Sequence, residues 1–575
     1  MKNKVILVIC FLLATVPTLC QTYITNVTIV DVDKQKLLPG QTVTITGDII
    51  SEIHGAKKTK IPAGATVIDG SGKFLMPGLT DAHVHFFQSG GLYTRPDGID
   101  LRKDKPYENE IAWVHNNMED FLHRYTMLGI TSVIDVGSTV SFLQQRDTFS
   151  NKSYAPKIYM TGPLLTSYEP KEFQNLKNNE PFYLVKNEEE GIKYVREQLP
   201  YHPDFIKIWY IANTADDAQR FQPIAKVIID EAHKNNLKVA VHATERITAQ
   251  LAVESDCDYL VHDIEDEVVQ NDFIQLLKSK KVILCPTLIV ADGYKNTFAQ
   301  KNNYSFYDLV NSNPLQIGSI TDLKHLPDTA IISRYKKQFN SKALINFFDH
   351  QDSVRMVNLK KLSDAGVIIV AGTDAGNIGT QHASSLFSEL KAMQKSGMSN
   401  WQIIRSATIN SAKIFDKEKT EGNIAIGKKA NAILLKANPI DDLENLKKID
   451  LVINRGFVIN PDSLIKETLP ALVQRQLNAY NLGNIDAFLE PYADDVELYD
   501  FPGNLVGKGK EYMRKEYEQM FKNLPDLHCE IKERIVQGNT IIDKESVTGA
   551  GPKAIEATAI YEIKNNKIGK VYFIQ

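Results

Sequence analysis

The middle of the chain alternates short apolar runs with helix-like segments, and this alternation limits the possible fold more than any other feature. Ala225–Lys234, for example, has a helical pattern and stands directly before the run Lys238–His242. The other runs are Ile130–Asp135, Lys157–Met160, Phe205–Trp209, Tyr259–His262, Val282–Cys285 and Val367–Ala371. With Lys73–Met76, which precedes His83, there are eight such runs. Eight β/α units predict a (β/α)8 TIM barrel.

The two flanks of this region have a different texture, with alternating β-branched residues and turns that predict a sheet. The strand-like pieces before residue 77 resemble those after residue 421, so we expect one small composite β-sandwich built from residues 21–77 and 421–465. The barrel then covers residues 78–420. Within it, the connection from Ile289 to about Gln351 is long enough to form a lid or a substrate loop.

After Pro461 the pattern changes again. Leu472–Tyr480 is helical and Asp486–Tyr492 continues in that way, and several strand-like pieces follow. We therefore predict a separate α+β domain, with a cone shape, over residues 466–575.

The first twenty residues have the pattern of a secretory signal peptide. A basic start at Met1–Lys4 precedes the apolar run Val5–Val16, which is too short to span a membrane, and small residues follow at Thr18–Cys20. Residues 1–20 are expected to be cleaved; a lipid anchor on Cys20 is the alternative, although Leu19 precedes it. We expect a periplasmic or secreted bacterial protein with no membrane segment after cleavage.

Composition argues against some partners and against a disulfide-supported fold. The net charge of −4 and the lack of a basic stripe argue against nucleic acid. After cleavage the cysteines are Cys257, Cys285 and Cys529, an odd number at wide spacing that does not form a disulfide framework.

Side chains that can bind a metal ion stand on or at the ends of several predicted strands, and barrel enzymes carry their active sites at the C-terminal ends of their strands. They are His83, His85, Lys207, His242, His262 and Asp374. His83 and His85 are two residues apart, so in a strand they project to the same face. Alone, His262 is explained as a core residue, Lys207 as a surface charge and Asp374 as a helix cap. Because the chain has only 13 histidines, four of them at the ends of three strands indicate a metal site.

These positions also carry a family resemblance. The segments are Pro77–His85, Phe205–Lys207, Val241–Ala243, Val261–His262 and Gly372–Gly376. Together they resemble the metal-dependent amidohydrolase superfamily, and within it the imidazolonepropionase-like and prolidase-like branch. Gly422–Pro439 is similar to that branch's return into the β domain, so the resemblance spans about residues 22–465.

The resemblance implies a role for each residue. His83, His85 and Asp374 would hold one divalent metal ion, and His242 and His262 a second. Lys207, carboxylated to a carbamate, would bridge the two ions, and imidazole and carboxylate ligands suit zinc.

The implied reaction is the hydrolysis of a C–N bond by a metal-bridged hydroxide, with Asp374 as general acid/base. The implied substrate is a small amide, a dipeptide or an N-acyl amino acid. His382 is a weaker candidate for substrate binding, and its alternative is an ordinary loop residue.

Some positions depart from the family pattern. Asn431 stands where Asp is usual, and Thr244, Glu245 and Asp263 follow the strand-end histidines where small residues are commoner. We expect these residues at the pocket wall. Their identities leave the substrate undetermined, but they do not affect the predicted metal site. A lactonase or a phosphotriesterase-type esterase would use the same site. A secreted binding protein without catalysis is less favoured, because no ligand position is missing.

The C-terminal region resembles the SnoaL-like, ketosteroid-isomerase-like domains through Val473–Asn481, Tyr492–Asp495 and Tyr499–Gly503. By spacing, Asp500 falls at the position of the isomerase base. Gln476 stands where those enzymes have a tyrosine, however, and Ala559 stands near the second acid. A barrel that is inert beside an active isomerase domain is therefore disfavoured. A binding or dimerisation module, with homo-oligomer formation through this domain, is the expectation.

Overall fold

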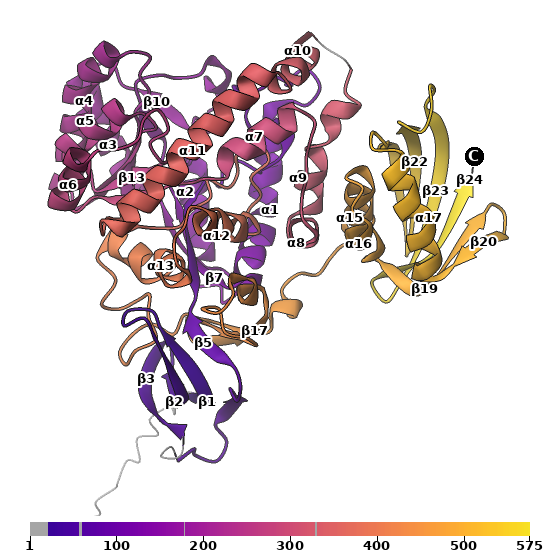
Figure 1. Cartoon of the computed structure of the whole chain (residues 1–575), viewed down its shortest axis with the longest axis horizontal. Helices are drawn as coiled ribbons and strands as arrows, with labels where there is room; N and C mark the ends of the chain where they lie inside the picture. Colours follow the sequence, from indigo (N-terminus) through magenta and orange to yellow (C-terminus); the bar gives the residue numbers. More distant parts are fainter. Residues whose placement is uncertain (1–20, 57–59, 178, 328–329, 575) are drawn as a thin grey trace, which may run out of the picture.

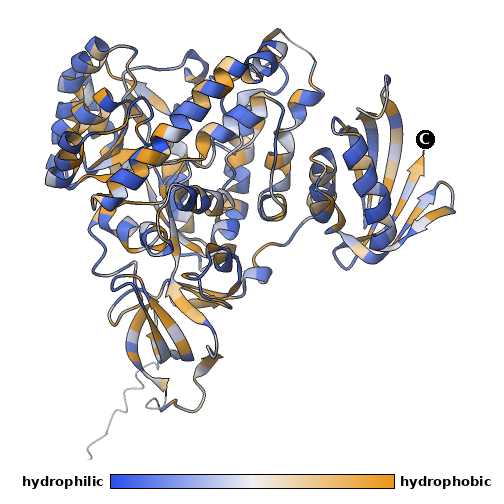
Figure 2. Ribbon diagram, in the orientation of Figure 1, coloured by the Kyte–Doolittle hydropathy of each residue, from blue (hydrophilic) through white to orange (hydrophobic). Residues whose placement is uncertain are grey.

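The computed structural model describes residues 21–574 except 57–59, 178 and 328–329. The predicted signal peptide, residues 1–20, lies outside this range. A barrel forms the centre, a small β domain lies at one end and the C-terminal domain stands to one side (Figure 1). Apolar residues follow the strands and the inward sides of the helices, and hydrophilic ones cover the outer helix surfaces (Figure 2).

The barrel strands are parallel and lie in the order of the sequence. They are β6 (Leu79–Val84), β7 (Ile130–Asp135), β8 (Lys157–Met160), β11 (Phe205–Trp209), β12 (Lys238–His242), β13 (Tyr259–Val261), β14 (Ile283–Cys285) and β15 (Ile368–Ile369). Two short strands extend this sheet: β9 (Leu164–Thr166) pairs with β11, and β10 (Phe182–Leu184) pairs with β9.

Backbone hydrogen bonds connect the two sets of strands around the ring. The Ala82 amide donates to Ala371 at 2.9 Å, which joins the first strand to the last, and the Asp204 amide donates to Met160 at 2.9 Å between β8 and β11. The predicted (β/α)8 class is confirmed.

One predicted barrel strand was wrong. The apolar run Lys73–Met76 was expected to open the barrel, but β5 (Phe74–Pro77) pairs with the β domain instead. The first barrel strand is β6, which is fully buried although it contains Thr80, Asp81 and His83. A polar strand gives no apolar signal in the sequence. Gly78 separates the two strands, and any side chain there would overlap Thr131 of β7 at about 2.2 Å.

Helices cover the outside of the barrel. They are α1 (Tyr107–Met127), α2 (Val140–Arg146), α3 (Glu188–Gln198), α4 (Ala215–Lys234), α5 (Arg246–Glu254), α6 (Asn271–Lys280), α11 (Lys342–Asp364), α12 (Ser385–Lys395), α13 (Asn400–Ser406) and α14 (Ile409–Ala412). Their starts follow from capping residues: Asn187, Thr214 and Ser341 accept backbone N–H groups of α3, α4 and α11. These caps fix the residue at which each helix begins, and therefore the length of the loop that precedes it.

The long connection after β14 is helical. It forms α7 (Val290–Phe298), α8 (Phe306–Asn311), α9 (Pro314–Ser319) and α10 (Ala330–Phe339) before α11. A satellite core of Leu92, Ile99, Phe298, Ile320 and other apolar residues fixes it to the loop after β6. The connection is thus a packed insertion over the barrel mouth.

The small β domain is built from both flanks of the barrel. Its strands are β1 (Gln21–Asp31), β2 (Lys36–Thr46), β3 (Ile49–Gly55), β4 (Thr66–Asp69), β5, β16 (Ala432–Leu435), β17 (Ile449–Asn454) and β18 (Phe457–Ile459). They join in the order β18-β17-β16-β5-β1-β2-β3, with β4 on β1, and the antiparallel pairing of β16 with β5 unites the two flanks. Register shifts bend β1, and the strands enclose a core that includes Ile29, Val43 and Leu434.

Asn431 does not reach the barrel pocket, which corrects the expectation from the sequence. Its side-chain oxygen accepts the Arg455 amide at 2.7 Å, beside the turn of Arg455 and Gly456 that joins β17 to β18. Both turn residues have positive φ, 51° and 81°, as a two-residue hairpin of this type requires. The replacement of the family's usual Asp by Asn431 therefore affects a turn of the β domain and not the pocket wall.

The C-terminal domain is an α+β unit. A sheet in the order β20-β19-β24-β23-β22-β21 is covered on one face by helices (Figure 1). Its elements are α15 (Leu469–Asn481), α16 (Ile485–Leu489), β19 (Tyr492–Asp500), β20 (Asn504–Lys508), α17 (Gly509–Asn523), β21 (His528–Gln537), β22 (Thr540–Thr548), β23 (Ile555–Lys564) and β24 (Lys567–Ile574). The helix predicted over Asp486–Tyr492 ends earlier, since Tyr492 already belongs to β19.

Helix α15 packs on α9 of the barrel insertion. The Asn478 side chain donates to the Pro314 carbonyl at 2.7 Å, and a side chain at Gly318 would overlap Asn478 at about 2.5 Å. Nearby, the rings of His325 and His528 stack and share a hydrogen bond of 2.8 Å. Among the residues that the structure describes, no helix has the length and apolarity needed to span a membrane.

Candidate metal centre at the barrel mouth

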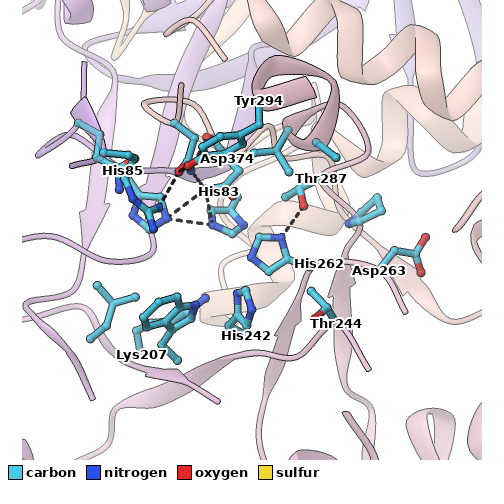
Figure 3. Close-up of a pocket in the computed structure, with 18 of the residues that line it drawn as sticks. His83, His85, Lys207, His242, Thr244, His262, Asp263, Thr287, Tyr294 and Asp374 are labelled. Atoms are coloured by element: carbon cyan, nitrogen blue, oxygen red, sulfur yellow. Dashed lines mark hydrogen bonds and ion pairs between the residues drawn. The ribbon is translucent and has the colours of Figure 1, made fainter. Parts of the chain in front are cut away.

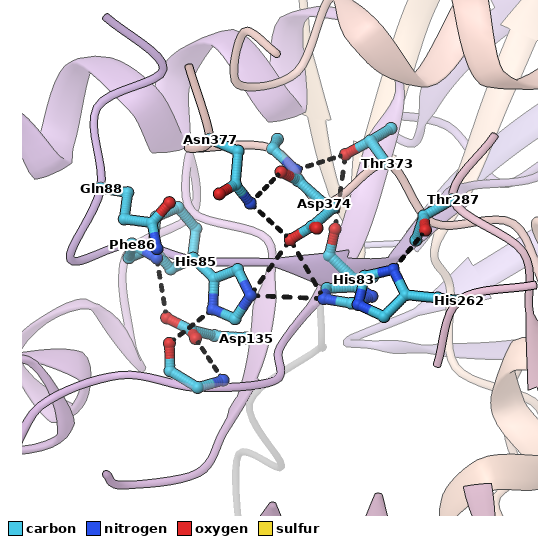
Figure 4. Close-up of polar contacts among 12 residues, drawn as sticks. His83, His85, Phe86, Gln88, Asp135, His262, Thr287, Thr373, Asp374 and Asn377 are labelled. Atoms are coloured by element: carbon cyan, nitrogen blue, oxygen red, sulfur yellow. Dashed lines mark hydrogen bonds and ion pairs between the residues drawn. The ribbon is translucent and has the colours of Figure 1, made fainter. Parts of the chain in front are cut away.

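His83 and His85 meet Asp374 at the end of β6 (Figures 3 and 4). The two imidazole Nε2 atoms are 3.3 Å apart, and Asp374 Oδ1 lies 3.2 Å from His83 Nε2 and 3.1 Å from His85 Nε2. All three side chains are buried. Three potential ligand atoms thus converge on one point inside the protein.

The spacing of these atoms fits one metal ion. Ligand atoms about 2.0–2.1 Å from a tetrahedral ion are roughly 3.3 Å from one another. The His85 Nδ1–H donates to the Gly137 carbonyl at 2.7 Å, so Nε2 keeps its lone pair, as is usual for a metal-binding histidine. The donor set and its orientation therefore suit a divalent cation such as zinc.

Three further predicted residues face the same cavity but stand apart from this cluster (Figure 3). The ring of His262 lies 4.3 Å from that of His242 and 4.9 Å from that of His83, measured between centroids. Thr287 Oγ1 holds His262 Nδ1 at 2.7 Å. Lys207, from β11, is 1% exposed, and its ammonium makes no hydrogen bond or ion pair with the residues that the structure describes.

Burial shifts the pKa values of several ionisable groups in this site. Loss of solvent lowers the pKa of His83 to about 4 and that of Lys207 to about 7. Burial acts to raise the pKa of Asp374, but the adjacent His83 and His85 outweigh it and hold that pKa well below its usual range. A neutral imidazole at His83 beside the ionised Asp374 carboxylate is a combination that can bind a cation.

Two of these residues have a strained backbone. Asp374 has φ of 60° and His262 has φ of 77°, in the left-handed region that most side chains avoid. Hydrogen bonds hold both in place: the Asp374 amide donates to His83 and the His262 amide donates to Cys285, each at 2.8 Å. The strained turns direct both side chains into the cavity.

Asn377 orients the Asp374 carboxylate, a role that the sequence did not reveal (Figure 4). Its Nδ2 donates to Asp374 Oδ1 at 2.7 Å. Its Oδ1 accepts from Arg95 at 2.8 Å and from the Tyr294 hydroxyl at 2.7 Å. Asp97 in turn holds the Arg95 guanidinium with two hydrogen bonds. The only local signal was the position of Asn377, three residues after Asp374.

The cavity around the site has a volume of about 240 Å³ and two different walls. The apolar wall contains Phe87, Leu164, Phe182 and Trp209. The polar wall contains Thr244, Asp263, Glu265 and Arg355, and α7 adds Val290, Ala291 and Tyr294. Thr244 and Asp263 therefore do lie at the pocket wall, and the insertion supplies part of that wall.

His382 does not line this cavity. It is buried behind the loop that follows β6, where its Nε2 meets the Gln88 carbonyl at 2.8 Å and its Nδ1 meets the Tyr125 hydroxyl at 3.0 Å. Its ring stacks on Phe86. Because both ring nitrogens are engaged, His382 supports the loop rather than facing a ligand.

This fold and site define a barrel of the metal-dependent hydrolase type. The amidohydrolase family model matches residues 74–459, which is more than half of the chain, and a SnoaL-like domain model matches residues 473–571. The chain belongs to the amidohydrolase family.

Individual relatives are distant. A dihydroorotase of Bacillus licheniformis is 47% identical over 49 residues, which is 8% of this chain and 11% of that protein. An enamidase of Eubacterium barkeri is 22% identical over 308 residues, covering 50% of this chain and 69% of the enamidase. The crystal structure of an Xaa-Pro dipeptidase with bound methionine matches with a TM-score of 0.59 and 21% identity, over 76% of this chain and 100% of that one. At this identity the likeness supports the fold alone.

We expect Asn377→Ala to weaken metal binding by roughly 10–100-fold, the usual cost of losing a side chain that orients a ligand. Without the Asn377 amide, Asp374 loses the hydrogen bond that fixes its carboxylate. The measurement is zinc affinity by competition with a chromophoric chelator. Asn117→Ala, on α1 outside the cavity, is the control, and equal affinities of the two variants would contradict the role.

Proposed function

We propose that the protein is an exported, metal-dependent amidohydrolase that hydrolyses a C–N bond of a small amide, dipeptide or N-acyl amino acid. The observation that carries this proposal is the convergence of His83 Nε2, His85 Nε2 and Asp374 Oδ1 within 3.1–3.3 Å of one another, inside a cavity at the barrel mouth. The family match supports the same chemistry.

His83, His85 and Asp374 would hold one divalent ion, most readily zinc, and His242 and His262 a second. Two such ions, when bound, supply an acidified water and polarise the carbonyl under attack. Asp374 Oδ1 is held by Asn377, whereas its Oδ2 has no hydrogen bond to a residue that the structure describes. This oxygen would take a proton from the attacking water and transfer it to the leaving nitrogen.

Lys207 would be carbamylated and bridge the two ions. A buried, unpaired ammonium is strongly disfavoured, and Lys207 is 1% exposed with apolar neighbours in its strand. The neutral amine nitrogen would add to the carbon of carbon dioxide and release one proton, which gives a carbamate anion. This modification removes the unpaired positive charge and adds two oxygens that can act as ligands.

The cavity supports a small substrate with one apolar and one polar part. Its volume of about 240 Å³ suits a dipeptide-sized molecule. Trp209 and Phe182 stack at the apolar wall, while Arg355 and Glu265 lie on the polar side, 3.8 Å apart. An amide whose acyl and amine portions differ in polarity would use both walls.

Export rests on residues 1–20, with cleavage before Gln21 and a periplasmic or secreted location. Self-association through the C-terminal domain is supported by exposed apolar residues: Phe501 in the turn between β19 and β20, Leu505 and Val506 on β20, and Ile535 and Val536 on β21. Neither feature alters the chemistry of the barrel site.

The purified, metal-loaded protein should hydrolyse at least one member of a panel of dipeptides and N-acyl amino acids, measured as release of the free amine. Lactones and phosphotriesters complete the panel, because a lactonase or a phosphotriesterase-type esterase would use the same site. Turnover of these esters with no amide cleaved would replace the amidohydrolase proposal with an esterase.

A double variant, His83→Ala with His85→Ala, should retain at most about one of two bound ions, because it removes two of the three atoms of the tight cluster. The measurement is metal content by mass spectrometry after gel filtration. The control is His115→Ala, since His115 hydrogen-bonds Gln145 and Ser141 outside the cavity. Full metal content in the double variant would show that the cluster is only a polar loop.

Lys207→Ala should lose the bridging oxygens, and with them at least one ion and most of the activity. Addition of a short-chain carboxylic acid such as propionate should restore part of both, because its two oxygens can fill the vacated position. The control Lys226→Ala removes an ammonium that pairs with Asp230 on the outer surface of α4. Full activity in the Lys207→Ala variant, or unmodified Lys207 in a well-resolved crystal structure of the active protein, would leave a mononuclear hydrolase.

A further inference from the structure

The C-terminal domain encloses a second cavity, of about 430 Å³, between its helices and its sheet. Aromatic and aliphatic side chains form most of its wall: Leu477, Tyr480, Phe488, Tyr492, Tyr517, Met520, Leu527, Val547, Ile555, Tyr561 and Phe573. The walls come from α15, α16 and α17 on one side and from β22, β23 and β24 on the other. This cavity belongs to a different domain from the metal centre.

A chain of hydrogen bonds ends on a buried carboxyl group in this cavity. The Tyr492 hydroxyl donates to Gln476 Oε1 at 3.1 Å, and Gln476 Nε2 donates to the Tyr561 hydroxyl at 3.2 Å. The Tyr561 hydroxyl then donates to Glu545 Oε1 at 3.0 Å. Glu545 Oε2 has no hydrogen bond to a residue that the structure describes. The arrangement fixes one carboxyl oxygen and leaves the other available.

The charge of the cavity is one-sided. Its lining includes Glu545 at the buried end and Glu516 at the exposed end, but no lysine, arginine or histidine among the residues that the structure describes. The nearest guanidinium, that of Arg534, is already paired with Asp543 by two hydrogen bonds of 2.7 Å. Anionic ligands would meet two carboxylates and no cation. Aromatic faces attract cations as well.

The isomerase residues expected from the resemblance do not form this site. Asp500, at the predicted base position, is exposed and does not line the cavity, and Ala559 supplies no acid. The acid is Glu545 instead, on β22, and its partner hydroxyl is that of Tyr561 on β23. The residues that line the cavity therefore suit the binding of a ligand and not the isomerase reaction.

We propose that this cavity binds a small hydrophobic ammonium compound, an aromatic alkylamine, with its ammonium group on Glu545 and its ring among the tyrosines and phenylalanines. Glu545 Oε2 would accept a charge-assisted hydrogen bond from the ammonium group. The aromatic wall would cover the apolar part and add cation–π attraction. The inference does not depend on the reaction of the barrel.

The surroundings of Glu545 give this binding a defined pH dependence. The titratable and charged groups around it are Tyr561, Tyr492, Tyr517, Tyr480, Cys529, Asp543 and Arg534, with Glu516 at the exposed end of the cavity. Burial, with a smaller contribution from Asp543, raises the pKa of Glu545 to about 7. Because the ammonium needs the ionised carboxylate, affinity should be full above this pKa and decrease as pH falls through it.

The test compares tryptamine with indole-3-propionate by calorimetry on the full-length protein at pH 8. The two probes share a ring and differ in the sign of their charge. Tryptamine should bind at least about tenfold more tightly than indole-3-propionate, and Glu545→Gln should weaken tryptamine by about tenfold or more. Glu562→Gln is the matched control, because Glu562 follows Tyr561 and so lies on the opposite face of the sheet.

Two further variants keep the result interpretable. Ala557→Phe fills the cavity while leaving Glu545 in place, so it should abolish binding even if Glu545→Gln does not fold. The His83→Ala, His85→Ala double variant should bind tryptamine like the wild type, which separates this cavity from the metal centre. Equal affinity for both probes, unchanged binding in Ala557→Phe, loss of binding in the histidine double variant, or no saturable binding of tryptamine would each overturn the proposal.

Discussion

The site depends on an arrangement that is unfavourable without a cation: three electron-rich atoms facing one another in a buried pocket. Two imidazole nitrogens and a carboxylate oxygen lie 3.1–3.3 Å apart, and solvent is largely excluded. Burial of such groups is costly unless something compensates them. The barrel holds these groups in place. The backbone N–H of Asp374, in the loop after β15, donates a hydrogen bond to the carbonyl of His83 on β6 and so joins the two segments.

Supporting contacts extend this arrangement outward through the structure. Gly137 fixes the tautomer of His85, and Asp135 holds the surrounding loop through the amides of Phe86 and Gly137. On the other side, Asn377 connects Asp374 to Arg95 and to Tyr294 of the insertion. The insertion also packs against the C-terminal domain through α9. One segment therefore contacts both the metal site and the appended domain.

The sequence predicted those parts of the fold whose signals are local. Strands such as β11 and β12 are short apolar runs, and the candidate ligands stand near strand ends or, for Lys207, within β11, so both could be predicted by position. The structure places all six around one cavity. By contrast, β6 contains Thr80, Asp81 and His83, and the Asp81 carboxylate accepts a hydrogen bond from the hydroxyl of Thr373, which lies far along the chain. A pattern of apolar residues cannot reveal a strand of this kind.

The orienting contacts were missed for a related reason. Arg95 and Tyr294 come from a loop and an insertion, and they reach Asn377 across 282 and 83 residues of sequence. Only folding brings them together, and neither residue type is distinctive by itself. The C-terminal acid was likewise misplaced: Asp500 matched by spacing, but β19 leaves it exposed, whereas Glu545 on β22 faces the cavity.

The left-handed backbone at Asp374 and His262 has an evolutionary consequence. A glycine would adopt either conformation without the steric cost that Asp374 at 60° and His262 at 77° incur, so both positions lower the stability of the fold. Selection for a more stable chain and selection for a functional site therefore favour different residues there. As long as the metal site is under selection, these two turns are places where the protein retains residues that its backbone alone would reject.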